Sequence, residues 1–197
     1  MNYLAHVFLA GAEPAAVAGA LLGDFVKGRQ VETYPATVRA AILLHRAVDR
    51  YTDQHPLVSA SRGLVSPSRR RFAGILVDVF YDHFLARHWS RYSAEALPAF
   101  TARVYAALAT HARPAPERLQ RMLPQMRAHD WLASYGEPAA INLAIDGIAR
   151  RLRRPNNLVG GGAELQDSYE SYEAHFLEFF PQLMANVPTL TKKAEAA

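Results

Sequence analysis

The sequence predicts an all-α protein, a single-domain helical bundle. In nearly every segment, apolar residues recur with the 3.6-residue period of a helix. Ala, Leu and Arg, which favour helices, are abundant, and Pro or Gly stands at the breaks. No turn of the Asn-Gly kind separates alternating strands. A length of 197 residues suits one domain with its own core.

Capping and breaking residues mark the expected helix ends. Asn2 can cap a first short helix, and Pro14 and Pro35 open later ones. His55-Pro56 starts a short piece, and Ser66-Pro67 starts a long helix. The expected helices of this half cover residues 3–9, 14–23, 35–52 and 66–89, with a loop at 24–29.

The second half of the chain continues in the same way. Helices are expected over 93–111, 116–128, 137–151 and 163–185, the last with an aromatic face that belongs to the core. Three consecutive glycines make 155–162 the clearest flexible loop. We expect one domain over 1–190 and a disordered, charged, alanine-rich tail over 191–197.

Composition narrows the class of protein. The chain has no cysteine, which excludes disulfides, iron–sulfur clusters and thiolate zinc sites and fits a reducing compartment. The first 26 residues lack the early positive charge of a secretory signal. No run approaches the roughly 18 apolar residues of a membrane span. We therefore expect a cytoplasmic protein that does not cross a membrane.

The formal net charge of +4 favours an acidic partner. Arginine supplies most of it, in one cluster at 69–71 and another at 150–154. These clusters either dock a partner or form solvated helix faces. Nucleic acid is not favoured, because neither cluster has interleaved aromatic residues and no nucleic-acid-binding signature is present.

Two carboxylates occupy the apolar face of the expected helix 66–89. Asp78 and Asp82 share a stripe with Ile75 and Leu85. Like charges one turn apart repel, and an unpaired carboxylate in an apolar setting costs several kcal/mol. A divalent cation is the simplest compensation.

The same anomaly recurs elsewhere in the chain. His45 and Asp49 lie one turn apart on the core face of the helix 35–52, while Arg46 could either reach into a site or meet solvent. His6 lies among apolar residues, and Asp24 closes a helix with no other charge after Glu13. Mixed imidazole and carboxylate ligands suit manganese, iron or zinc, and an oxygen-rich set leans to manganese or magnesium.

Other metal and phosphate chemistries lack their motifs. No Glu is followed three residues later by His, as a di-iron carboxylate bundle requires. There is no His-Glu-x-x-His and no glycine-rich phosphate loop. A His- and Asp-lined metal site on helices instead indicates metal-assisted phosphoester hydrolysis.

The chain resembles the acyl carrier protein phosphodiesterases in several ordered blocks. These are Met1-Asn-Tyr-Leu-Ala-His6, Leu22-Gly-Asp24-Phe-Val-Lys-Gly28, His45-Arg-Ala-Val-Asp49-Arg-Tyr-Thr-Asp53, and Asp78-Val-Phe-Tyr-Asp82-His-Phe-Leu85 with Arg87-His-Trp89. The resemblance covers most of the chain, thins between Ala94 and Trp131, and returns in the last helix. It implies an all-helical relative of the His-Asp metal phosphohydrolases that removes 4′-phosphopantetheine from holo-acyl carrier protein. The implied cofactor is manganese, with magnesium or iron(II) as alternatives.

Within that resemblance, roles can be assigned to residues as a hypothesis. Asp24, His45, Asp78 and Asp82 would hold the metal, with His6 and Asp49 either completing the ligand set or orienting it. His83 is the first candidate to protonate the leaving serine oxygen, although it points away from Asp82. Lys27 and Arg46 are candidates for phosphate contacts, and the arginine clusters for docking the carrier protein.

Two other functions stay open at this point. One is a metal-dependent phosphohydrolase acting on a nucleotide or another small phosphodiester, which would have little use for exposed arginine clusters. The other is a non-enzymatic helical adaptor for an acidic partner, in which the buried acids pair with arginines.

Overall fold

Helices make up every regular element in residues 1–112 and 114–195, the part of the chain described by the structure, a computed structural model. This confirms the predicted fold class. The α-helices are α1 (Tyr3–Leu9), α2 (Pro14–Leu22), α3 (Ala36–Gln54), α4 (Pro56–Leu64), α5 (Ala73–Arg87), α6 (Leu97–His111), α7 (Glu117–Ala128), α8 (Trp131–Ser134), α9 (Pro138–Arg151), α10 (Ala163–Asp167) and α11 (Tyr169–Glu195). Three 3₁₀ helices, η1 (Gly28–Thr33), η2 (Pro67–Phe72) and η3 (Trp89–Arg91), lie between them.

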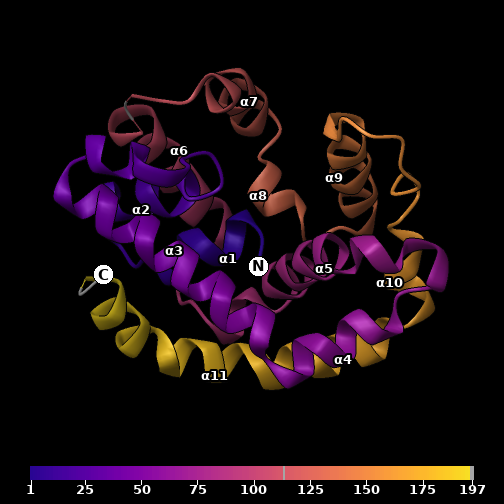
Figure 1. Cartoon of the computed structure of the whole chain (residues 1–197). Coiled ribbons are helices and arrows are strands. Elements are labelled where there is room, and N and C mark those ends of the chain that lie inside the picture. Colours follow the sequence, from indigo (N-terminus) through magenta and orange to yellow (C-terminus); the bar gives the residue numbers. More distant parts are fainter. Residues whose placement is uncertain (113, 196–197) are drawn as a thin grey trace.

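Helix α5 is the central element. It is buried almost all round, not along one stripe, and Phe80, Tyr81, Asp82, His83 and Phe84 are all fully buried. A helix that is apolar on every side is buried on every side. It packs against α1, α4, α8, α9 and α11 (Figure 1). The polar groups of α5 must therefore find partners inside the protein.

The long helix α11 covers one side of the core. Its aromatic residues Tyr172, Phe176, Phe179 and Phe180 are fully buried, as the sequence predicts. It runs as a curved rod along α3, α4 and α5 (Figure 1). Pro181 and Pro188 lie inside it, and each removes one intrahelical hydrogen bond.

Helices α2 and α3 form the closest pair. At Gly19 an added Cβ would lie 2.4 Å from the Val38 carbonyl oxygen, so only glycine permits this approach. The pair places the end of α2 against the middle of α3. Helix α1 and the amino terminus lie at the centre of the molecule, between this pair and α5 (Figure 1).

Four predicted boundaries are wrong. The expected helix 163–185 is two helices, α10 and α11, separated at Ser168 (φ −139°). The expected helix 66–89 is η2, α5 and η3, because Phe72 leaves helical geometry (ψ 6°) where the Arg69 side chain ties η2 to the loop 155–160. Helix α6 begins at Leu97, not at residue 93. Helix α11 continues to Glu195, where the sequence predicts a tail from 191, while residues 196 and 197 lie outside the described part.

Within the described residues, no helix is both long and apolar enough to cross a membrane.

Candidate metal centre

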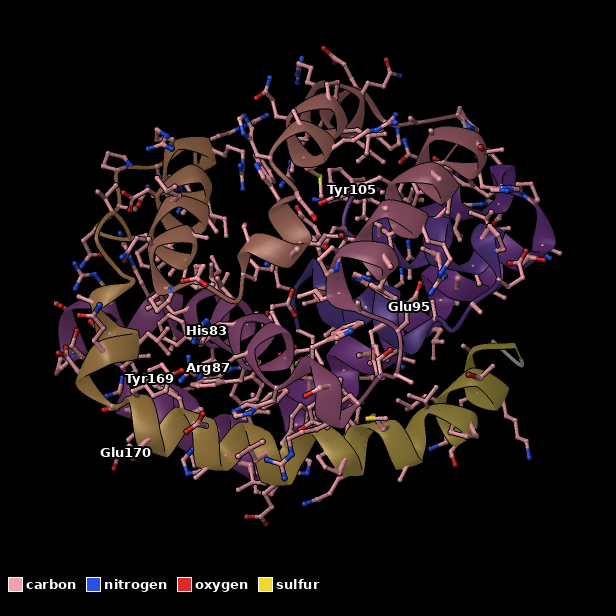
Figure 2. The ribbon with its side chains drawn as sticks, turned by 180° about the vertical axis from the view of Figure 1, so that it is seen from behind. His83, Arg87, Glu95, Tyr105, Tyr169 and Glu170 are labelled. Atoms are coloured by element: carbon pink, nitrogen blue, oxygen red, sulfur yellow. The ribbon has the colours of Figure 1, made fainter. Side chains whose placement is uncertain are left out.

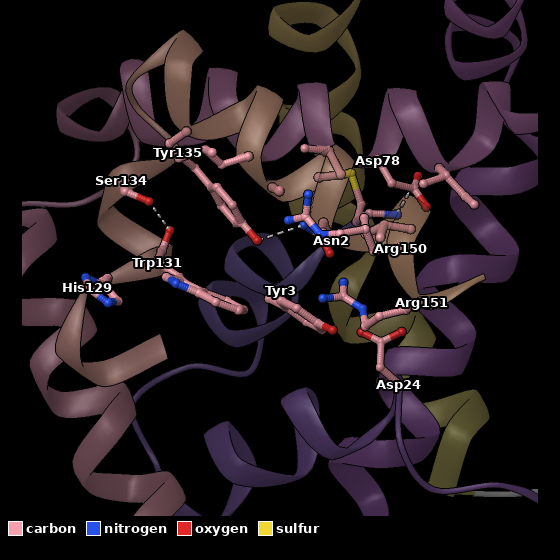
Figure 3. Close-up of a pocket in the computed structure, with 18 of the residues that line it drawn as sticks. Asn2, Tyr3, Asp24, Asp78, His129, Trp131, Ser134, Tyr135, Arg150 and Arg151 are labelled. Carbon is pink, nitrogen blue, oxygen red and sulfur yellow. Dashed lines mark hydrogen bonds and ion pairs between the residues drawn. The ribbon is translucent and has the colours of Figure 1, made fainter. Parts of the chain in front are cut away.

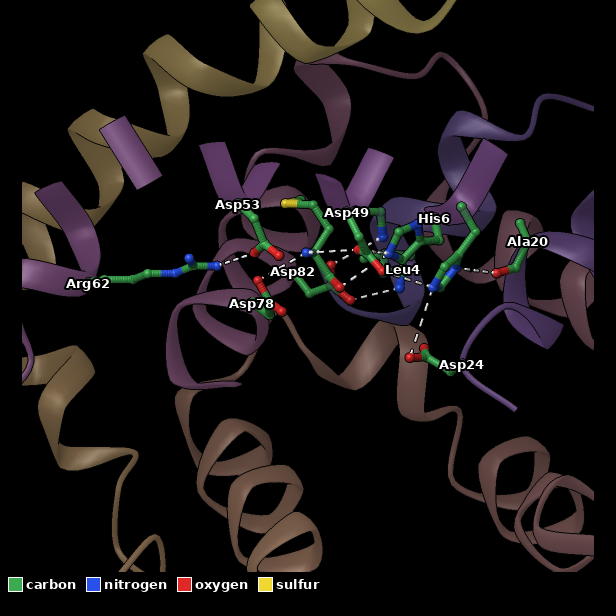
Figure 4. A network of polar contacts seen from close by, with 12 residues as sticks. Leu4, His6, Ala20, Asp24, Asp49, Asp53, Arg62, Asp78 and Asp82 are labelled. Carbon is green, nitrogen blue, oxygen red and sulfur yellow. Dashed lines mark hydrogen bonds and ion pairs between the residues drawn. The ribbon is translucent and has the colours of Figure 1, made fainter. Parts of the chain in front are cut away.

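Three side chains from two helices meet at the centre of the protein. His6 of α1 and His45 and Asp49 of α3 each offer one ligand atom, and these atoms lie within 4.8 Å of one another. Asp49 bridges the Nε2 atoms of the two imidazoles, with Oδ1 3.0 Å from His6 Nε2 and Oδ2 3.2 Å from His45 Nε2. The two rings stack with centroids 3.6 Å apart. Figure 4 shows His6 beside Asp49. We call these three residues the His-Asp cluster.

Backbone contacts orient His45. Its Nδ1 donates to the Ala20 carbonyl oxygen at 2.7 Å, and its Nε2 faces the Asp49 carboxylate at 3.2 Å. A carbonyl partner on the far ring nitrogen is the usual support of a metal-binding histidine. Gly23 lies against the ring, since a Cβ there would be 2.3 Å from His45 Cγ.

The charges of the cluster depend on one another. Burial, and then the neighbouring charge of His45, lower the pKa of His6 to about 3, so His6 is neutral. Burial also acts to lower the pKa of His45, but the hydrogen bond to Asp49 and the charge of Asp24 outweigh it and raise that pKa. Hydrogen bonds from both imidazoles overcome the effect of burial and hold the pKa of Asp49 well below its usual range.

Asp24 lies at the edge of the cluster. Its Oδ1 is 3.9 Å from His45 Nε2, and its side chain is 40% exposed. Burial is the largest effect on its pKa, which is raised despite the neighbouring charge of His45. The turn that carries it is held by Arg46, whose Nη2 donates to the Val26 carbonyl oxygen at 3.0 Å.

Asp78 faces the amino group of Met1. Its Oδ1 lies 3.0 Å from this ammonium, which is also 3.7 Å from Asp49 Oδ1. Burial lowers the pKa of the ammonium, but Asp78 and Asp49 raise it to about 10, so it stays charged at neutral pH. Sequence reasoning missed this cation, because a terminal amine has no side-chain signal. It offsets the charge that the sequence argument assigned to a metal.

Asp82, predicted as a metal ligand and catalytic residue, accepts hydrogen bonds from two backbone amides. Leu4 N–H donates to Oδ2 at 2.7 Å and Ala5 N–H donates to Oδ1 at 3.2 Å. These are free amides at the start of α1, where a helix favours negative charge. Burial nevertheless raises the pKa of Asp82 to about 7. Asp82 therefore anchors α1, and through it His6 (Figure 4).

His83, predicted as a proton donor, is hydrogen-bonded through both ring nitrogens. Its Nδ1 donates to the Tyr135 carbonyl oxygen at 2.8 Å, and its Nε2 accepts from the Tyr169 hydroxyl at 2.9 Å. Burial lowers its pKa, which keeps it neutral. Figure 2 shows His83 beside Tyr169, where it joins α5 to α11. Both ring nitrogens are engaged in holding helices together.

The structure places both residues predicted to contact phosphate near the segment that follows α2. Arg46 supports the Asp24 turn, and Lys27 is exposed beside η1. Neither residue lines the large pocket that opens next to the cluster.

This pocket has a volume of about 800 Å³. Asp24, Asp78 and Met1 line the part of the pocket next to the His-Asp cluster. Asp24 and Asp78 are labelled in Figure 3. Its other walls come from the start of α7, from α8 and from α9, and include Trp131 and Tyr135. The sequence indicated Arg150 and Arg151 as part of a basic cluster, but nothing local indicated Trp131 or Arg118 as pocket residues.

The donors fit a divalent cation. Two imidazole nitrogens and a carboxylate, with neighbouring ligand atoms about 3 Å apart, match the spacing around an ion with bonds of about 2.1 Å. Two protons must move. His45 must lose the Nε2 proton that it donates to Asp49, and His6 must change its tautomer. Its Nε2 faces both Asp49 and the Met1 carbonyl oxygen, so in this arrangement Nε2 carries the proton, which must move to Nδ1 for Nε2 to bind a cation.

The two arginine clusters meet on one side of the molecule. Arg69 donates from Nε to the Asn157 carbonyl oxygen at 2.9 Å and pairs with buried Glu164 at 3.2 Å. Arg71 donates to the Pro155 carbonyl oxygen at 3.2 Å. Part of this basic charge therefore holds η2 against the loop after α9. The adaptor hypothesis required the buried acids of α5 to pair with arginines. Among the described residues they form no such ion pair, and the Met1 ammonium and the α1 amides are their partners instead.

Fold and site together define a class: an all-helical protein with a His-Asp cluster that could bind a metal, beside a large pocket. Comparison with known proteins identifies the family. Residues 1–183 match the family model described as acyl carrier protein phosphodiesterase. The chain belongs to this family.

Full-length relatives agree. A protein of Serratia proteamaculans named acyl carrier protein phosphodiesterase is 38% identical over 185 residues, covering 93% of this chain and 96% of the relative. Proteins of the same name from Photorhabdus laumondii and Enterobacter sp. are 37% and 35% identical, covering 93% of this chain and 93% and 96% of the relatives. No solved structure gives a significant match.

Proposed function

We propose that this protein hydrolyses the phosphodiester bond between 4′-phosphopantetheine and the serine of holo-acyl carrier protein, giving the apo-protein. Family membership over residues 1–183 supports the reaction. The observation that carries the chemistry is the His-Asp cluster, two imidazoles on one carboxylate, beside a pocket large enough for a substrate.

His6, His45 and Asp49 are the proposed metal ligands, and Asp24 is the proposed fourth. Manganese is the proposed ion, with magnesium or iron(II) as alternatives, because imidazole and carboxylate donors suit these ions. A bound divalent cation supplies a more acidic water and offsets negative charge on the phosphoryl oxygens.

The protein's own groups prepare the site. The Ala20 carbonyl fixes the His45 tautomer, and Arg46 holds the turn that carries Asp24. The Met1 ammonium offsets the charge of Asp78. A phosphodiester anion therefore approaches a site that is less negative than its carboxylates alone would make it.

The proposed partner is holo-acyl carrier protein, bound from the side on which η2 meets the loop after α9. Arg70, Arg153 and Arg154 are exposed there, and Arg150 and Arg151 line the adjoining pocket. A basic surface suits an acidic carrier and speeds its association. The absence of cysteine fits a reaction in the reducing cytoplasm.

The test is incubation with holo-acyl carrier protein and manganese, followed by intact-mass spectrometry of the carrier. Wild-type protein should convert the carrier to its apo form, and His45→Ala and Asp49→Asn should slow conversion at least about 100-fold. His111→Ala, at the end of α6, is the matched control and should retain wild-type activity. An unchanged carrier mass with every divalent metal would refute the proposal. Cleavage of a cyclic nucleotide but not of the carrier would instead favour the small-phosphodiester alternative.

A further inference from the structure

Three arginines converge on the pocket beside the His-Asp cluster. Arg150 and Arg151 come from the end of α9, and Arg118 comes from the first turn of α7. All three are exposed, and none forms an ion pair with a residue in the described part of the chain. Their guanidinium groups are therefore available to a ligand.

Two of these arginines lie close enough to repel each other. The charges of Arg118 and Arg151 both act to lower the pKa of Tyr3, against the larger effect of burial. Arg118 and Arg150 also oppose the charge of Arg151, whose pKa is lowered, chiefly by burial. Like charges that converge without a carboxylate partner are stabilised by an anion, and guanidinium groups suit the oxygens of a phosphate.

The position of Arg151 relates this anion site to the cluster. Figure 3 shows Arg151 beside Asp24 and the Tyr3 hydroxyl, on the side of the pocket toward the cluster. Asp24 is 3.9 Å from His45 Nε2. A phosphoryl group held by Arg151 would therefore lie next to the proposed metal ligands.

Another part of the pocket is lined by apolar side chains. Ala140, Leu143, Ala144 and Ile148 of α9 form one wall, and Trp131 of α8 lines the pocket as well. Leu143 is 70% exposed and forms part of this apolar wall. The volume of about 800 Å³ is more than a phosphoryl group needs and matches sites for ligands of coenzyme size.

We propose that this pocket is the binding site for the phosphopantetheine arm, with Arg118 and Arg151 holding the phosphoryl group and the α9 wall holding the pantetheine chain. The inference rests on the proposed function for the identity of the arm. Arg118 and Arg151 are specificity-determining residues of the site. Leu143 and Ala144 contact the chain.

The test measures binding, not turnover. Free 4′-phosphopantetheine and pantetheine, which lacks the phosphate, are titrated into the full-length, chelator-treated protein by calorimetry. Wild-type protein should prefer phosphopantetheine. Arg118→Gln and Arg151→Gln should each weaken phosphopantetheine at least about tenfold and leave pantetheine unchanged, since each removes a charge-assisted hydrogen bond. Ala144→Trp should weaken both ligands by filling the space along α9.

Arg121→Gln is the matched control, because Arg121 is an exposed arginine on α7, three residues from Arg118, that does not line the pocket. Its phosphopantetheine affinity should equal that of wild type. Equal binding of both ligands by wild-type protein, no binding of either, or an equal loss in Arg121→Gln and Arg118→Gln would overturn the inference. If the protein converts the carrier but the pocket variants bind phosphopantetheine as wild type does, the proposed reaction stands and the proposed pocket is refuted. If the pocket binds phosphopantetheine as expected but the carrier is not converted, the pocket stands and the proposed reaction is refuted.

Discussion

At the scale of single residues, His45 depends on a glycine. Gly23 has helical dihedral angles (φ −51°, ψ −35°), so alanine fits the backbone there. Its Cβ would nevertheless lie 2.3 Å from the His45 ring. A contact this short forces either the ring or the end of α2 to move.

Gly23→Ala should therefore displace His45 and reduce carrier conversion at least about tenfold, because small misplacement of a reacting group has large effects on rate. The control is Gly63→Ala in α4, where an added Cβ meets nothing within 4 Å. That variant should keep full activity and gain up to about 1 kcal/mol of stability. Mass spectrometry of the carrier and thermal melting of each variant provide the measurements. Equal activity in both variants would contradict the steric argument.

Asp82 is the residue whose role depends most on pH. Its pKa is about 7 when folded and near 3.8 when exposed, so the folded state binds the extra proton between these values. Ionisation of Asp82 therefore lowers the free energy of unfolding as the pH rises from about 4 to 7. Asp82→Asn removes this titration, although it also replaces one acceptor by a donor.

Relative to wild type, the stability of Asp82→Asn should therefore improve steadily as the pH is raised from 4 to 8. Chemical denaturation at several pH values measures the difference. A difference that is constant across this range, or that changes in the opposite direction, would show that burial does not raise the pKa of Asp82.

At the scale of elements, buried Glu164 joins η2 to α10. It accepts from the Ser66 hydroxyl at 2.5 Å, from the Ser66 amide at 2.8 Å and from Arg69 at 3.2 Å. These hydrogen bonds overcome the effect of burial and lower its pKa. The break between η2 and α5 is maintained by these contacts, which come from residues about 95 positions away.

Glu164→Gln should destabilise the protein by about 1–3 kcal/mol at neutral pH, because it weakens charge-assisted hydrogen bonds of a buried group. A group with a lowered pKa contributes stability above its unfolded pKa and loses it as the pH falls through the folded value. The difference from wild type should therefore shrink below about pH 4. Glu178→Gln, exposed on α11, is the control and should change stability by less than about 0.5 kcal/mol. Urea unfolding of each variant at neutral pH and below about pH 4 provides the test.

At the scale of the whole molecule, a cation at the His-Asp cluster would link elements distant in sequence. His6 lies on α1 and His45 and Asp49 on α3, and α2 packs against both of these helices. An ion that binds only the folded state stabilises it by about 2.7 kcal/mol at 100 times its dissociation constant.

Manganese should therefore raise the melting temperature of wild-type protein, and a chelator should reverse the rise. Because the imidazoles must lose their protons to bind an ion, the rise should diminish as the pH is lowered. His45→Ala should abolish the manganese effect, whereas His111→Ala should retain it. Differential scanning calorimetry measures each case. A rise that is equal in His45→Ala and in wild type would place the ion elsewhere.

The sequence by itself determined the fold class, most helix positions, the family and the presence of a His and Asp site. The helical period of apolar residues, the capping residues and the prolines are local signals. The motifs shared with the family are read directly from the order of residues. The regular face of the helix 35–52 therefore placed His45 and Asp49 together, and the structure agrees.

Only the tertiary structure decided what each polar group meets. Spacing along one helix predicts that Asp78 and Asp82 share a face, but it does not predict which residues of other segments contact that face. The fold brings the amides of α1 to Asp82 and the Met1 ammonium to Asp78, and it assembles the pocket from α5, α7, α8 and α9. Burial leaves a carboxylate in need of a partner, and the packing of distant segments determines whether that partner is a metal, an amide or an ammonium.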